Sequence, residues 1–258
     1  MANPKKIGAA PAPQRGGGGA RRAPSGPTIS PEEIPSWQQP SSQALESAAR
    51  EERPLVIYFP SEGANDSEFY GEALARLSES DAVFIRVPFT SDREKSPWAE
   101  ETAVPTSKLL SDNPSRDYKV AVGKATVIIA DSWGNEHYRP TTLPTADQIR
   151  SQLKKVREAV SKDNDKLQKT FEKAKAAHEA SNRKEALKHI FANFKADVVG
   201  LPAQEETIRL YHEIMDSART EIGELKAAGN KEALKTLAKD LKKTDVEKEI
   251  DEALKELK

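Results

Sequence analysis

Cysteine is absent from all 258 residues of the chain. This absence excludes disulfides, thiolate nucleophiles, thiolate metal sites and lipid attachment through sulfur, although it leaves the redox compartment open. The chain also has no run of about 18 apolar residues, which a membrane-spanning helix requires. No apolar stretch follows Lys5 and Lys6, as it would in a secretory signal. We therefore expect a soluble protein that needs no membrane, and we assign it to the cytoplasm.

Acidic residues are missing before Glu32, and residues 1–36 are instead rich in Pro, Gly and Ala. Such a composition cannot bury enough apolar surface to offset the entropy cost of ordering, so we predict a disordered tail. Two interpretations remain open. The tail either solubilises the chain without a dedicated partner, which we favour, or binds nucleic acid or an acidic partner through counterion release. The candidate nucleic-acid contacts are Lys5, Lys6, Arg15, Arg21 and Arg22.

Residues 37–160 alternate between helix and strand patterns, which predicts an α/β domain. The continuous apolar run from Leu55 to Phe59 is typical of a central strand covered on both faces. Gly134 follows another apolar run and can supply the positive φ of a tight hairpin turn. After an initial helix, the predicted order is β-α-β-α-β-β-α. The predicted strands are 55–59, 82–87, 125–130 and 135–139, and the predicted helices are 41–52, 66–77, 98–111 and 145–160.

Residues 161–258 show only helix patterns, and these patterns repeat. The letters KEALK at 184–188 recur at 231–235, and the apolar positions around them recur at the same spacing. Such a period predicts two helical hairpins, as in helical-repeat (tetratricopeptide-like) regions, followed by a terminal helix. Two hairpins make only a marginal core. We therefore expect this region to dock on the preceding domain or on a second copy, which makes a homo-oligomer possible.

The predicted order over 37–160, with a loop that runs directly from Phe59 into a helix, resembles the thioredoxin-like superfamily. In that family the loop carries a Trp-Cys-x-x-Cys motif, and a cis-proline precedes the third core strand. Aligned from Phe59, neither cysteine is present here, and an alanine stands where the resemblance places the proline. The degenerate redox-loop positions are Gly63, Ala64, Ser67 and Ala125.

The loss of both sulfurs has a direct chemical consequence. Thiol–disulfide exchange requires one thiolate to attack and another to leave, and a serine hydroxyl cannot replace either. We expect the remaining loop to act as an N-cap, through Asn65, Asp66 or Ser67, for the helix that follows. The resemblance also implies a groove that binds a protein without chemistry. Its candidate residues are Tyr70, Trp98 and Lys124, whereas Phe69 is expected in the core.

Trp133, at the predicted hairpin tip, either folds back on the sheet or is offered to a partner as an interface anchor. The four histidines show no metal-ligand spacing, and no phosphate-binding glycine loop follows a strand, so we predict no metal and no cofactor. The sequence therefore predicts a non-catalytic protein-binding or scaffold module. The alternative is a nucleic-acid-associated protein that uses its basic tail, and an enzyme with non-thiol chemistry is least favoured.

Overall fold

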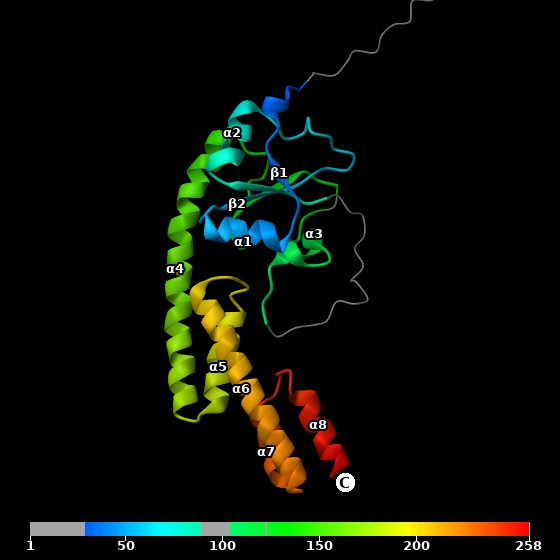
Figure 1. Cartoon of the computed structure of the whole chain (residues 1–258), viewed down its shortest axis with the longest axis vertical. Coiled ribbons are helices and arrows are strands. Elements are labelled where there is room, and N and C mark those ends of the chain that lie inside the picture. Colours follow the sequence, from blue (N-terminus) through cyan, green and yellow to red (C-terminus); the bar gives the residue numbers. More distant parts are fainter. Residues whose placement is uncertain (1–28, 89–103, 122, 258) are drawn as a thin grey trace, which may run out of the picture.

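The computed structural model describes residues 29–88, 104–121 and 123–257. It is a mixed α/β structure in which a sheet domain stands at one end of an elongated molecule and a helical region at the other (Figure 1). One long helix, α4 (Ala146–Glu179), runs along the side of both parts. The C-terminus lies at the far end of the helical region.

The sheet has five strands in the order β1-β3-β2-β4-β5. The first three strands in that order are parallel, and β4 and β5 are antiparallel to their neighbours. Central strand β2 is completely buried, as its apolar run predicts. The predicted hairpin is present, and Gly134 has φ +88° in its turn. The strands are β1 (Trp37–Gln38), β2 (Leu55–Phe59), β3 (Val83–Arg86), β4 (Thr126–Ala130) and β5 (Glu136–Tyr138).

Helices cover both faces of the sheet because alternate strand residues point to opposite sides. Ile57 and Ile85 belong to the core beneath α1 (Ser42–Arg50). This core also includes Leu109 of the short helix η2 (Lys108–Leu110) and Tyr118, which directly follows the short helix α3 (Pro114–Asp117). The neighbouring residues in the strands form a second core with α2 (Glu72–Ser80) and the first half of α4. The sheet domain is therefore a three-layer structure.

Helix α4 begins where the sequence predicts, because Thr145 and Gln148 form a capping box. The prediction that it ends at residue 160 is wrong, since it continues to Glu179 without a break. Apolar residues such as Leu167 and Ala174 resume the buried stripe beyond that point. The boundary that we drew between 160 and 161 therefore falls inside one continuous helix.

The second half of α4 packs with four further helices around a single apolar core. Asn182 and Asn230 cap the two helices that carry the repeated letters, and each cap follows a residue with positive φ, Ser181 or Gly229. The two turns thus reuse the same local geometry. The helices are α5 (Arg183–Phe194), α6 (Pro202–Ala227), α7 (Lys231–Asp240) and α8 (Glu247–Glu256).

Three other predicted boundaries change. The folded part begins before residue 37, because the short helix η1 (Pro31–Glu33) contacts α2 and the Ser36 N–H donates to Ser78 Oγ at 2.8 Å. Helix α2 begins at Glu72 rather than at 66. Of the predicted helix 98–111, residues 98–103 lie outside the described residues, and the rest contains only the short helix η2.

Candidate binding sites

The loop at 60–70 follows β2 and is held by the Glu68 carboxylate. This carboxylate accepts hydrogen bonds from the Ser61 N–H at 2.9 Å, from the Ser61 hydroxyl and from the Tyr58 hydroxyl. Burial raises the pKa of Glu68, but these hydrogen bonds more than offset that effect, so its pKa lies below the ordinary value. A carboxylate of this kind is a weak base. It fixes the loop rather than activating Ser61.

The predicted capping role of this loop is wrong. The Asn65 side chain accepts from the Ser67 N–H at 2.9 Å, which closes a turn within the loop, and Asp66 pairs with Arg86 at 2.8 Å. The residue at the N-cap of α2 is Gly71, with φ +138° and no side-chain cap. The helix starts late because Phe69 is buried among aromatic rings and holds the preceding chain outside the helix.

A groove of about 530 Å³ lies where β1, β2 and β3 end. Trp37 and Arg86 contribute to its wall, and Ala64 lines it from the 60–70 loop. The Arg86 guanidinium also lies 6.0 Å from the centre of the Tyr58 ring. Ser61, which lines the groove, donates its hydroxyl to the Glu68 carboxylate. Its lining is Trp37, Gln38, Gln39, Pro60, Ser61, Gly63, Ala64, Arg86 and Pro88.

The predicted groove on the other side of this loop is only partly assembled. A Cβ placed on Gly123 would lie 3.7 Å from the Glu62 Cβ, so the loop does approach the turn before β4. Lys124 beside that turn is exposed, and Tyr70 is half-buried. The other predicted positions are dispersed: Ser67 is exposed, Ala125 packs on the core beneath α2, and Trp98 lies outside the described residues.

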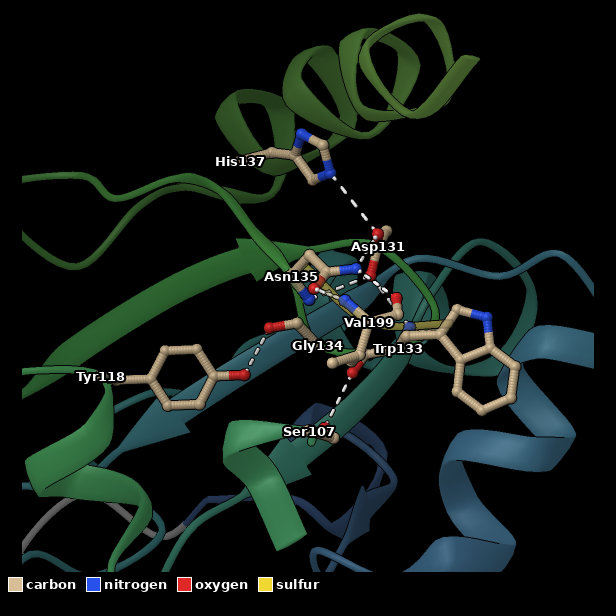
Figure 2. Close-up of polar contacts among 8 residues, drawn as sticks. All are labelled: Ser107, Tyr118, Asp131, Trp133, Gly134, Asn135, His137 and Val199. Atoms are coloured by element: carbon tan, nitrogen blue, oxygen red, sulfur yellow. Dashed lines mark hydrogen bonds and ion pairs between the residues drawn. The ribbon is translucent and has the colours of Figure 1, made fainter. Parts of the chain in front are cut away.

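The turn between β4 and β5, residues 131–135, contacts the helical region through Asn135 (Figure 2). The Asn135 side chain donates to the Val199 carbonyl at 2.8 Å and accepts from the Val199 N–H at 2.8 Å. Asp131 orients that amide by accepting from its nitrogen at 2.7 Å. Both side chains are buried. This paired contact joins the sheet domain to the loop between α5 and α6, as the expected docking requires.

Trp133 stands in the same turn, and its side chain packs against other residues of the chain. It packs against the core beneath α1, and a Cβ placed on Gly200 would lie 2.1 Å from its Cγ. The Ser107 hydroxyl donates to the Trp133 carbonyl at 2.8 Å, and the Tyr118 hydroxyl donates to the Gly134 carbonyl at 2.5 Å (Figure 2). The predicted hairpin tip is thus covered by the helical region.

A second groove, of about 500 Å³, lies between α4 and α6. Phe171 and Leu210 give it an apolar part, and Lys175 and Arg209 give it two cations without ion-pair partners among the described residues. His178 Nε2 lies 3.5 Å from the Glu213 carboxylate. No pattern in the sequence indicates this groove, because its residues come from helices that are neighbours only in the folded chain. Its remaining lining residues are Glu179 and Glu206.

Across residues 29–88, 104–121 and 123–257, no three His, Asp or Glu side chains gather in a way that could hold a metal ion. None of the helices within those ranges is both long and apolar enough to cross a bilayer. Comparison of the chain with protein-family models and with curated proteins finds no match. A functional proposal therefore depends on the geometry of the two grooves and of the junction.

Proposed function

We propose that this chain is a non-catalytic scaffold that binds a protein partner, built from a thioredoxin-like domain and a helical-hairpin region. The observation that carries the partner site is the groove between α4 and α6, which combines apolar and charged walls. The 60–70 loop supports the non-catalytic part, because its polar contacts serve its own structure. The strand order and the parallel and antiparallel pairings support the thioredoxin-like part of the proposal. Because the chain contains no cysteine, it cannot carry out thiol–disulfide exchange.

The groove between α4 and α6 is the partner site that we favour. Its apolar part and its charged walls can hold a peptide segment by burial and by complementary charges, a combination typical of protein interfaces. The groove also lies within one packed unit, because the second half of α4 and α6 share the apolar core of the helical region. A rigid surface loses less entropy when it binds than a mobile one does.

A charge-reversal experiment tests this site. The double variant K175E/R209E reverses both cations of the α4–α6 groove. K184E/K195E makes the same charge change at an exposed residue of α5 and at its C-cap, outside the groove. Proteins retained by the immobilised full chain are identified, and the purified partner is then titrated against each variant. We expect at least a tenfold loss of affinity for the groove variant alone. Equal binding by both variants would remove the α4–α6 groove from the proposal.

A second candidate function is nucleic-acid association through the tail, because residues before Glu32 carry five cations and no acidic residue. Binding of this kind falls steeply as salt rises. The deletion that tests it should stop at residue 28, since residues 31–36 contact α2. The measurement is the affinity for a mixed-sequence DNA or RNA duplex at two salt concentrations. Binding that survives the deletion, or that is indifferent to salt, contradicts this candidate.

A further inference from the structure

One stretch of α4 joins its two packed halves without a buried side chain of its own. From Ser161 to Lys166 every side chain is exposed or half-buried, whereas Val156 before the stretch and Leu167 after it are buried. The same stretch includes Asp163, Asn164 and Asp165, which are poor helix formers because their side chains compete for backbone hydrogen bonds. The helix therefore has a weak local preference in a stretch without a buried side chain, and the Asn164 side chain, which accepts from the Ala203 N–H at 3.0 Å, ties this stretch to α6.

This weak stretch also lies between the two large cores. The core of the sheet domain reaches α4 at Val156, and the core of the helical region reaches it at Ala174. Between them stands a small cluster in which only Leu167, Leu201 and Ala203 are buried. A rotation of the helical region about residues 161–166 would keep the buried residues of each large core together. It would disturb the small cluster, the hydrogen bond of 3.0 Å from the Ala203 N–H to the Asn164 side chain, and the packing of Val104 on the helical core.

Contacts away from α4 hold the two parts together. The Asn135 side-chain amide donates to the Val199 carbonyl and accepts from the Val199 N–H, and Trp133 lies against Gly200. Nearby, Lys108 pairs with Asp197 at 2.5 Å. All three contacts meet the loop at 197–200, between α5 and α6, and Val104 adds an apolar contact with the helical core.

The arrangement seen in the structure also buries a polar side chain that has no hydrogen-bond partner. Gln204 stands in the first turn of α6, next to Ala203, and it is completely buried. Neither its amide nitrogen nor its amide oxygen has a hydrogen-bond partner in the described structure. Such a group is destabilising where it is and gains hydrogen bonds if water reaches it. It favours any movement that opens this region to solvent.

From these observations we propose that residues 161–166 of α4 form a hinge and that the contacts of the 197–200 loop form a latch. When the latch is closed, the molecule has the arrangement described above. When it opens, the helical region rotates as a unit about α4 and water reaches Gln204. The scaffold then has two arrangements, whose populations a partner can shift by binding one of them more tightly.

The absence of cysteine makes a distance measurement simple, because spin labels can be attached at two introduced cysteines without other changes. Glu46 of α1 and Ser217 of α6 are exposed and suit this purpose. We expect one narrow distance distribution for the labelled parent and an added, longer population for N135A. Adding D163A/D165A to N135A should remove that population by stiffening the hinge, and Q204L alone should keep the distribution narrow. N65A, an exposed asparagine in the 60–70 loop, is the matched control.

An unchanged distribution in N135A overturns the latch, and an open population that persists after D163A/D165A overturns the hinge. If N135A loses helical circular dichroism, amide hydrogen exchange of the unaltered full chain decides instead. We expect the amides of 163–168 and the Val199 amide to exchange faster than the amides near Val156 and Ala174. Uniform protection along α4 would contradict the proposal.

Discussion

The loop at 60–70 and the turn at 131–135 each follow a buried strand of one sheet, but they use their polar groups differently. Because β2 and β4 are antiparallel, with Leu55 opposite Ala130 and Phe59 opposite Thr126, the two segments lie at opposite ends of the sheet. The loop closes on itself through Glu68. The turn reaches a residue 64 positions away, Val199.

The two segments differ in whether their hydrogen bonds stay local or hold another region of the chain. A loop stabilised by its own side chains leaves the neighbouring surface open, and the groove at Trp37 lies there. A turn stabilised by another region uses its surface to fix that region, and Trp133 is covered as a result. Substitutions at the turn should therefore affect the whole chain, and substitutions in the loop should affect mainly the loop.

The largest effect is expected at Gly200. Its φ of +74° suits glycine, and a Cβ would lie 2.1 Å from Trp133 Cγ, so G200A must displace a large ring. We expect a loss of about 3 kcal/mol in the free energy of unfolding, measured by denaturant titration. The matched control is G223A in α6, where a Cβ meets nothing within 4 Å. Helix propensity should make that variant about 0.5–1 kcal/mol more stable. Equal effects would contradict the tight contact.

The second prediction concerns Asn135. Truncation by N135A leaves the Val199 N–H and carbonyl without their partner, and we expect a loss of about 2 kcal/mol in unfolding free energy. Asn65 is the comparison in the loop, where its bond to the Ser67 N–H is exposed, and N65A should cost no more than about 0.5 kcal/mol. The same denaturant titration measures both. If the two losses are similar, the turn has no special role.

The third prediction concerns acid. Glu68 has a folded-state pKa below its usual value of 4.5, so its stabilisation is present above that pH and is lost as the pH falls through the folded-state pKa. E68Q should cost about 1 kcal/mol at neutral pH, and the difference from the unaltered chain should shrink below pH about 4. Unfolding titrations from pH 7 to pH 3 measure this, with E62Q as the exposed control. A difference independent of pH would mean that the charge of Glu68 is unimportant.

The smallest effect is expected at the ion pair between Asp66 and Arg86. The Asp66 side chain is 53% exposed, and exposed pairs contribute little because water and salt screen them. We expect D66N to change the unfolding free energy by less than about 0.5 kcal/mol, with the remaining difference removed by 0.5 M salt. A loss as large as that of E68Q would show that the loop depends on this pair as well.

Much of the fold could be predicted from local patterns. The strand 55–59 and the start of α4 followed from an apolar run and a capping signal, and Gly134 identified the hairpin turn. The start of α2 could not be predicted, since Phe69 joins an aromatic cluster with Trp37, which is distant in the sequence. The candidate sites were harder still. No periodicity indicates that Lys175 and Arg209 face one groove, or that Asn135 meets Val199.

Residue type and spacing along one element were enough to predict the excluded chemistry, the buried strands and the helical character of the chain after residue 160. Tertiary structure decided that α4 is continuous, that Trp133 is covered and that a groove opens between α4 and α6. Each of these requires side chains from distant segments to meet, and such meetings follow from the packing of whole elements. Local patterns record which face of a helix is buried, but they do not record what lies against it.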